Sequence, residues 1–188
     1  MDMNSLNSIN NLNPVILLGY MGSGKTSIGK ILAKKYNCEF IDLDKVIEKK
    51  YNSSVSKIFS DLGELEFRRI EKIMLNQVLS YDHKFILSLG GGTPCYYDNM
   101  DIILSRSNNV FYIKVLTNIL SNRLFLRKEK RPIISNIQSI EKMNEFVSKH
   151  IFERIPFYEK SNYVIESNRN DKELVVKKIL QILSDNGF

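Results

Sequence analysis

The stretch GYMGSGKT, residues 19–26, follows the apolar run Val15–Leu18 and has the spacing G-x-x-x-x-G-K-T. Its glycines permit positive φ angles and a close approach of the backbone to a ligand, so successive N–H groups can point at phosphate oxygens. A helix beginning near Lys25 would add the positive end of its dipole. A glycine-rich turn could match by chance, but the strand before this stretch and the helix after it are the context that the motif requires. We therefore predict a nucleotide site.

The motif also assigns roles to its polar side chains. Lys25 would reach the β- and γ-phosphates, and the Thr26 hydroxyl would bind Mg²⁺. Tyr20 and Met21 are expected to pack rather than to touch phosphate. The predicted nucleotide-binding residues are Gly22, Ser23, Gly24, Lys25, Thr26 and Ser27.

The pattern of apolar runs predicts an α/β fold. Short runs rich in Ile, Val, Leu, Phe and Tyr predict buried strands at 14–18, 39–43, 84–89, 109–115 and 163–166. Helical patterns occupy 25–36, 64–79, 118–126, 140–153 and 172–184. Strands that alternate with helices predict a mostly parallel five-stranded sheet with helices on both faces, and ligands bind at the carboxyl ends of such strands.

The composition is that of a globular protein. Of the 188 residues, 43% are hydrophobic and 26% charged, and no apolar stretch approaches the length of a membrane span. Residues 1–12 are polar, Asn-rich and unlike a signal peptide, so we interpret them as a tail before one domain at 13–188. Cys38 and Cys95 are too few for a disulfide framework or a metal cluster, and we expect reduced thiols in the cytoplasm.

The net charge of +6 favours acidic partners. The basic residues do not form one tract with interleaved aromatics; they concentrate between Arg123 and Arg131 and elsewhere alternate with Glu along predicted helices. Solvated helix faces account for most of this charge, and a small phosphate-bearing substrate accounts for the rest as well as nucleic acid does. We expect neither a nucleic-acid nor a membrane partner.

Two carboxylates close the second predicted strand, in the sequence FIDLD. Two-residue spacing places Asp42 and Asp44 on one face of an extended segment. Asp42 could join the Mg²⁺ shell, and Asp44 reaches further, towards an acceptor whose hydroxyl needs a group to take its proton. Asp44 could equally cap a helix that begins at Lys45, since Asp is favoured there. The residues alone leave both interpretations open.

A pair of arginines and a run of glycines follow. GELEFRRIE, residues 63–71, places Arg68 and Arg69 early in a helix. Adjacent residues do not share a helix face, so one is expected to point into a cleft and the other to pair with Glu; an exposed salt-bridged helix is the alternative. FILSLGGGTP, residues 85–94, ends a buried strand with three glycines. A plain turn needs one or two, so three indicate a backbone that an anion or a hydroxyl approaches closely.

A basic segment, RLFLRKEKRPII at 123–134, contains Arg123, Arg127, Lys128, Lys130 and Arg131. We interpret it as a lid that closes cations over a transferring phosphate, although a solvated helix end accounts for Lys128 and Lys130 equally well. ERIPFY, residues 153–158, places Arg154 just before a helix-interrupting Pro156. Arg154 suits an anionic acceptor, and a surface arginine is the alternative.

Taken in order, the motifs GSGKT, FIDLD, GE-x-x-FR-x-x-E, SLGGG, RP-I-I and ER-x-P-x-Y resemble the shikimate kinase family at about the family's separations. The resemblance covers roughly residues 13–170. The loop is common to many families, whereas the combination of the other motifs is specific. It implies a three-layer P-loop kinase fold like that of nucleoside monophosphate kinases. It also implies ATP-dependent phosphorylation of the 3-hydroxyl of shikimate, a step in aromatic amino-acid biosynthesis.

The resemblance implies roles for single residues as well. Thr26 would be a direct ligand of one Mg²⁺, with Asp42 helping its shell. Asp44 would hold the hydroxyls of shikimate and take the reacting proton, while Lys25 and Arg131 complete the catalytic set. Arg131 would contact the phosphates of ATP and offset developing charge. The shikimate-binding residues would be Asp44, Arg68, Gly91, Gly92 and Arg154, with both arginines clamping the carboxylate.

The acceptor-binding region would span about residues 43–70 and the lid about 123–136. The lid departs from the family's pattern because it lacks glycine and because the spacing between Arg123 and Arg131 differs, which leaves an adenine contact at Arg123 in doubt. A second adenine-side residue would be Asn170, after a one-residue gap. The implied protein is a cytoplasmic monomer.

Two other classes share the loop. Another small-molecule kinase, such as a gluconate or nucleoside monophosphate kinase, need not have paired arginines beside a triple glycine. A GTPase switch would need an N-K-x-D motif and a D-x-x-G after the second strand, and neither is present. The motifs therefore favour the metabolic kinase.

Overall fold

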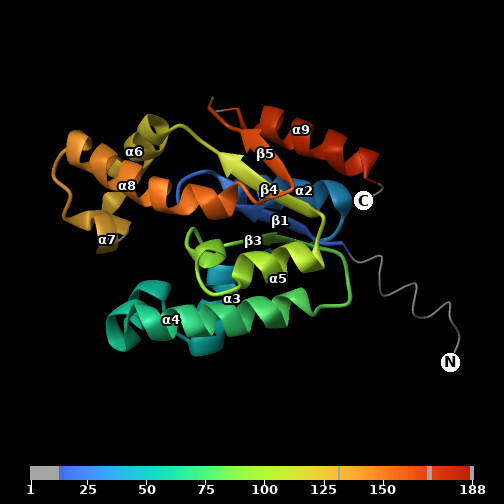
Figure 1. The fold of residues 1–188 in the computed structure, drawn as a ribbon, viewed down its shortest axis with the longest axis horizontal. Coiled ribbons are helices and arrows are strands. Elements are labelled where there is room, and N and C mark those ends of the chain that lie inside the picture. Colours follow the sequence, from blue (N-terminus) through green and yellow to red (C-terminus); the bar gives the residue numbers. More distant parts are fainter. Residues whose placement is uncertain (1–12, 131, 169–170, 187–188) are drawn as a thin grey trace, which may run out of the picture.

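The structure is a computed structural model that describes residues 13–130, 132–168 and 171–186. Its centre is a parallel sheet in the order β2-β3-β1-β4-β5 (Figure 1). The strands are β1 (Val15–Leu18), β2 (Glu39–Asp42), β3 (Phe85–Ser88), β4 (Asn109–Lys114) and β5 (Tyr163–Glu166). Each lies within one residue of its predicted position at both ends. The predicted α/β class and the mostly parallel five-stranded sheet are confirmed.

Helices cover both faces of the sheet, as predicted. They are α2 (Lys25–Tyr36), α3 (Leu43–Tyr51), α4 (Val55–Leu79), α5 (Asn99–Arg106), α6 (Thr117–Phe125), α7 (Pro132–Ser135), α8 (Ile140–Tyr158) and α9 (Lys172–Asp185), with 3₁₀ turns η1 (Thr93–Cys95) and η2 (Lys128–Lys130). Helices α2 and α9 pack together on one face, and α4, α5 and α8 lie on the other (Figure 1). None of the helices in the described ranges is both long and apolar enough to cross a membrane.

The central strands are apolar on both sides because helices cover both faces. Every residue of β1 is fully buried, and so are Phe85, Ile86 and Leu87 of β3. Gly29 lets α2 lie close to this sheet, since a Cβ there would meet the Phe40 ring at 2.5 Å. The central place of β1 puts the loop that follows it in the middle of the carboxyl edge of the sheet.

The sequence did not predict α3, α5, α7 or the first part of α4. Helix α4 begins at Val55, where Ser54 caps it by accepting from the backbone N–H of Lys57 at 3.2 Å. The predicted start at Glu64 coincides with a break at Gly63, which has φ 78° and ψ 169°. Helices α3 and α5 were also missed, because nine and eight residues are too few to show a clear period.

Helix α8 continues past its predicted end. It was expected to stop at Glu153 before an interrupting proline, but it runs to Tyr158 with Pro156 inside. The prediction was wrong because Pro156 lies in the last turn, where few helical residues follow. The predicted tail at residues 1–12 lies outside the described residues. Cys38 and Cys95 are both free thiols, in agreement with the sequence.

Candidate active site

The loop between β1 and α2 has the conformation that its glycines predict. Gly22 and Gly24 have φ angles of 83° and 99°, and Gly24 is the residue immediately before α2. The first N–H groups of α2 and the positive end of its dipole therefore face the cavity in front of the loop. The Lys25 side chain is buried, and its Nζ donates to the carbonyl oxygens of Gly19 at 2.7 Å and Tyr20 at 3.0 Å.

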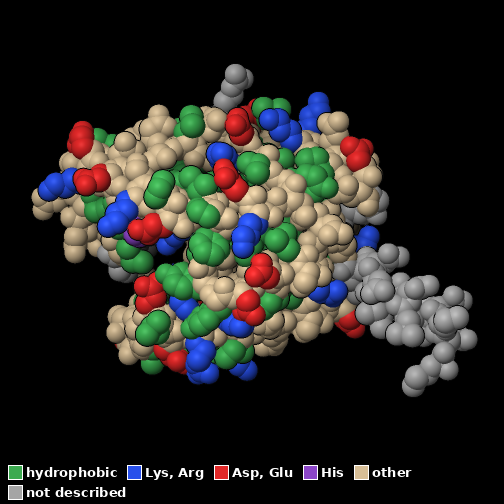
Figure 2. All heavy atoms as spheres, in the orientation of Figure 1, with side chains coloured by type: hydrophobic (Ala, Val, Ile, Leu, Met, Phe, Trp, Pro, Cys, Tyr) green, Lys and Arg blue, Asp and Glu red, His purple; other side chains and the backbone are tan. Residues whose placement is uncertain are grey.

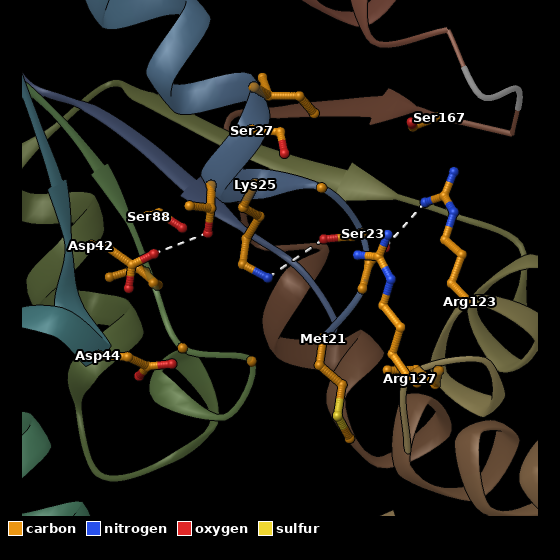
Figure 3. Close-up of a pocket in the computed structure, with 18 of the residues that line it drawn as sticks. Met21, Ser23, Lys25, Ser27, Asp42, Asp44, Ser88, Arg123, Arg127 and Ser167 are labelled. Atoms are coloured by element: carbon orange, nitrogen blue, oxygen red, sulfur yellow. Dashed lines mark hydrogen bonds between the residues drawn. The ribbon is translucent and has the colours of Figure 1, made fainter. Parts of the chain in front are cut away.

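A cavity of about 630 Å³ opens at this edge of the sheet. Figure 3 shows Lys25 between two acidic side chains on one side and Arg123 and Arg127 on the other. The lining residues include Met21, Gly22, Ser23, Gly24, Lys25, Thr26, Ser27, Asp42, Asp44, Ser88, Gly90, Gly91, Arg123, Arg127, Ser167 and Lys172. All six predicted residues of the nucleotide loop are among them. Tyr20 is buried and packs, as predicted, whereas Met21 is half-buried and lines the cavity.

Thr26 and Asp42 form a pair of oxygen donors at the loop. The Thr26 hydroxyl donates to Oδ2 of Asp42 at 2.9 Å, a contact visible in Figure 3. Nowhere in the described ranges do three His, Cys, Asp or Glu side chains gather as a metal cluster. One hydroxyl and one carboxylate suit Mg²⁺, which binds few protein oxygens and completes its octahedron with water and substrate phosphates. The residues present therefore fit this ion.

Asp44 does not lie where the strand pattern placed it. Strand β2 ends at Asp42 and α3 begins at Leu43, so the two carboxylates do not share one face of an extended segment. Asp44 is in the first turn of α3, whose N-cap position is Asp42, and no side chain caps that helix. The capping interpretation of Asp44 is therefore wrong. Both carboxylates still line the cavity, because the turn into α3 keeps them together.

The surroundings of Asp44 favour its neutral form. Burial raises its pKa, and the nearby negative charges of Asp42 and Glu71 raise it further, to about 6; Lys25 acts in the opposite direction. A carboxyl group with this pKa is ionised at neutral pH and still basic enough to accept a proton from a hydroxyl group.

Arg68 is the buried member of the arginine pair. Its Nη1 donates to Oε2 of Glu71 at 2.8 Å, and Nη2 and Nε face Oε1 of Glu64 at 3.3 and 3.4 Å. Arg69 is exposed and pairs with Glu66 at 2.6 Å. The prediction that the two arginines point in different directions is confirmed. The sequence did not reveal that the inward one is also paired with carboxylates.

Of the three glycines after β3, Gly90 and Gly92 make room for side chains, and Gly91 makes room for the backbone of the loop. A Cβ at Gly90 would lie 3.0 Å from Oδ1 of Asp44 and 3.0 Å from Oε1 of Glu71, and one at Gly92 would lie 2.6 Å from Nη2 of Arg68. At Gly91 the nearest atoms are Met21 N at 3.2 Å and Nη1 of Arg154 at 3.6 Å. We predicted that an anion or a hydroxyl approaches this backbone closely. In the structure, side chains of the protein itself lie close to Gly90 and Gly92.

Arg154 reaches this cluster from α8. Its Cζ lies 5.3 Å from the centroid of the Tyr20 ring, and Tyr158, one turn further along α8, donates its hydroxyl to the Gly91 carbonyl. Arg68 and Arg154 do not line the cavity in front of the loop. Arg68 lies against Gly92, and Arg154 lies near Gly91 beside Tyr20 of the loop. Figure 2 shows the surface on the side of the molecule that carries α4 and α8.

Two predicted site residues, Arg131 and Asn170, lie outside the described residues. Arg123 and Arg127 of the predicted lid segment line the cavity. It is also lined by Ser88, Ser167 and Lys172, to which the sequence gave no role. Nη1 of Arg123 donates to the Gly22 carbonyl at 3.1 Å, which ties α6 to the loop. The basic segment at 123–134 indicated the two arginines, whereas no motif in the sequence indicated Ser88, Ser167 or Lys172.

The glycine-rich loop between β1 and α2 of this parallel sheet defines the class of the protein as a P-loop fold. A gluconokinase from Sinorhizobium meliloti shares the fold alone, with a TM-score of 0.54 at 12% identity over 93% of each chain. The family profile described as "Shikimate kinase" matches residues 21–184. The chain belongs to the shikimate kinase family.

Individual relatives agree with this assignment. The chain is 40% identical to a shikimate kinase of Flavobacterium johnsoniae over 171 residues, which is 90% of this chain and 98% of the relative. The crystal structure of shikimate kinase from Bacteroides thetaiotaomicron has a TM-score of 0.83 at 33% identity, covering 92% of this chain and 98% of that one. The structure of the Acinetobacter baumannii enzyme in complex with shikimate has a TM-score of 0.81 at 30% identity, covering 96% and 97%.

Proposed function

We propose that this protein transfers the γ-phosphoryl group of ATP to the 3-hydroxyl of shikimate. The observation that carries the proposal is the gathering of Asp44, Arg68 and Arg154 around three consecutive glycines, beside the cavity of the nucleotide loop. A carboxylate-bearing polyol needs both a proton acceptor and cations in such an arrangement. The shikimate bound to the relative from Acinetobacter baumannii supports the same acceptor.

On the nucleotide side, the loop N–H groups and Lys25 hold the β- and γ-phosphates and stabilise the charge that develops on them. Gly22, Ser23, Gly24, Thr26 and Ser27 complete this set. Arg131 and Asn170, which lie outside the described residues, are proposed to contact ATP from the lid and the adenine side.

Mg²⁺ is proposed as the metal, with Thr26 as a direct ligand and Asp42 supporting its shell. When bound, the ion neutralises charge on the phosphates and fixes their orientation. The Thr26–Asp42 hydrogen bond holds these two oxygen atoms, the proposed metal-binding groups, close together at the loop.

On the acceptor side, Asp44 orients the reacting hydroxyl and takes its proton. Arg68 and Arg154 bind the carboxylate of shikimate, with the backbone at Gly91 and Gly92 against its ring. The oxygen of the acceptor hydroxyl forms the new bond to phosphorus, the bond from phosphorus to the bridging oxygen of ADP breaks, and the proton passes to Asp44. The enzyme is proposed to act in the cytoplasm as a monomer, with residues 43–70 as acceptor-binding region and 123–136 as lid of one domain at 13–188.

An ADP-release assay with purified protein tests the proposal. ATP, Mg²⁺ and shikimate together should release ADP in amounts equal to shikimate 3-phosphate formed, and omission of shikimate should reduce the rate to background. Gluconate and a nucleoside monophosphate serve as the competing acceptors. Turnover with either of these and none with shikimate would contradict the proposal.

A further inference from the structure

Glu64 holds one edge of the Arg68 guanidinium group. Its Oε1 faces both Nε and Nη2 of Arg68, at 3.4 and 3.3 Å. These two N–H groups form one of the edges with which an arginine binds a carboxylate through two parallel hydrogen bonds. The other partner, Glu71, is 1% exposed and belongs to the core, whereas the side chain of Glu64 is 53% exposed. Only Glu64 is therefore placed to leave Arg68 without disturbing the packing.

Tyr96 keeps Glu64 in this position. The Tyr96 hydroxyl donates to the same Oε1 at 2.7 Å, and its ring covers the guanidinium group, with Cζ of Arg68 4.1 Å from the ring centroid. The hydrogen bond from Tyr96 lowers the pKa of Glu64, and the charges of Arg68 and Arg154 lower it further. Glu64 is thus a carboxylate at neutral pH, within the field of both arginines.

The backbone places Glu64 at the start of a helical segment. Gly63 interrupts α4 directly before it, and a Cβ at Gly63 would meet nothing within 4 Å, so the positive φ alone demands glycine there. The Glu64 side chain, which follows this glycine, is about half exposed although it contacts Arg68 and Tyr96. It can turn to solvent by rotating about its own bonds.

We propose that Glu64 is an internal substitute for the acceptor's carboxylate, which occupies the Nε–Nη2 edge of Arg68 until the acceptor displaces it. The inference rests on the proposed function, which assigns Arg68 to a carboxylate. A buried guanidinium group without a full set of partners is costly, so Glu64 stabilises the site before the acceptor arrives. The same contact costs acceptor affinity, because two carboxylates cannot occupy one edge.

The test is the substitution Glu64→Gln, which retains the size of the side chain and its acceptor for the Tyr96 hydroxyl while removing the charge. By calorimetry, shikimate should bind about two- to fivefold more tightly, the factor expected for one partly exposed ion pair. The Kd for ATP should not change. Glu66→Gln is the matched control, since Glu66 pairs with Arg69 at 2.6 Å on the exposed side of the same helix. Its Kd for shikimate should equal that of the wild type.

Unchanged or weaker binding of shikimate by Glu64→Gln overturns the inference, because Glu64 would then position Arg68 or have no part in binding. Tyr96→Phe keeps the ring over Arg68 and removes the hydroxyl that holds Glu64, so it should also bind shikimate more tightly, by a smaller factor. Weaker binding there would mean that this hydroxyl serves the acceptor and does not hold Glu64 against it.

A crystal structure with shikimate gives an independent readout. Oε1 of Glu64 should lie beyond hydrogen-bond distance of Nε of Arg68, and persistence of that contact would overturn the inference. The wild-type assay separates this failure from that of the proposed function. If the wild type releases no ADP with shikimate, both fail; if it does and Glu64→Gln gains no affinity, only the inference fails.

Discussion

The nucleotide side and the acceptor side of this site are built in different ways. The nucleotide side is built around one continuous segment, residues 19–27, in which even Lys25 is held by carbonyl oxygens of its own loop. The acceptor side takes Asp44 from α3, Arg68 from α4 and Arg154 from α8, and gathers them around the glycines after β3.

The two sides also differ in charge. The loop offers backbone N–H groups and one lysine, which act together on an anion. The acceptor side places carboxylates and guanidinium groups in contact. Burial, together with the negative charges of neighbouring carboxylates, raises the pKa of Asp44 there to about 6. Substitutions on the nucleotide side should therefore abolish transfer, whereas those on the acceptor side should separate acceptor binding from nucleotide binding.

Lys25→Ala should have the largest effect. Loss of the cation at the β- and γ-phosphates is expected to reduce kcat by about 10³-fold or more. The fold should persist, as judged by circular dichroism and Tm. Lys30→Ala is the control, because Lys30 is an exposed lysine on the same helix. Normal ATP turnover by Lys25→Ala in the presence of shikimate would show that the loop has another role.

Asp44→Asn should reduce kcat by about 10²-fold or more, because it keeps the shape and removes the proton acceptor. It should also stabilise the protein at pH 7. The folded pKa is raised from 3.8 to about 6, so the contribution of Asp44 to stability is greatest below pH 3.8 and is lost as the pH rises through about 6. Urea unfolding at pH 7 should show a gain of about 1–3 kcal/mol in the free energy of unfolding. A variant with altered stability and normal kcat would leave Asp44 no catalytic part.

The pH dependence of wild-type activity also tests whether Asp44 is the proton acceptor. If ionised Asp44 is the proton acceptor, kcat/KM for shikimate should rise by about tenfold per pH unit and level off above about pH 6. Asp44→Asn should lose this acidic limb in its residual activity. A limb that survives in the variant would belong to another group.

Arg68→Lys tests the acceptor side by itself. A lysine cannot reproduce the planar fork, so KM for shikimate should rise at least about tenfold, while the Kd for ATP should change by less than about twofold. An analogue of shikimate with its carboxylate reduced to an alcohol should bind the wild type about tenfold more weakly or worse. Arg69→Lys is the matched control and should change neither constant. Equal losses for acceptor and nucleotide in Arg68→Lys would mean that Arg68 serves the nucleotide or the fold.

Much of this molecule could be predicted from short stretches of sequence. The five strands, α2 and the loop conformation depend on apolar periodicity and on glycines within a few residues of one another. Both signals lie within a few neighbouring residues, so they can be read from the sequence without knowing how distant segments pack. The family could be recognised because its motifs keep their order and separations.

Other features became visible only when segments far apart in the sequence were brought together. No local pattern in the sequence predicted the turn that puts Asp44 in α3 and not in β2. None predicted that α8 continues through Pro156 either. Residues such as Ser167 and Lys172 line the cavity because β5 and α9 pass beside it.

The sequence by itself therefore determined the strands, the helices α2, α6 and α9, and the glycine loop, because backbone conformation and the apolar pattern follow from neighbouring residues. The tertiary structure alone decided which groups meet across the three glycines. It placed Arg68 against Gly92, Arg154 near Gly91, and Asp44 beside Gly90. The raised pKa of Asp44 depends on its burial and on the charges of Asp42 in β2 and Glu71 in α4, which packing sets and no single stretch of sequence encodes. The pairing of Arg68 with Glu64 and Glu71, by contrast, stays within α4, at spacings of four and three residues.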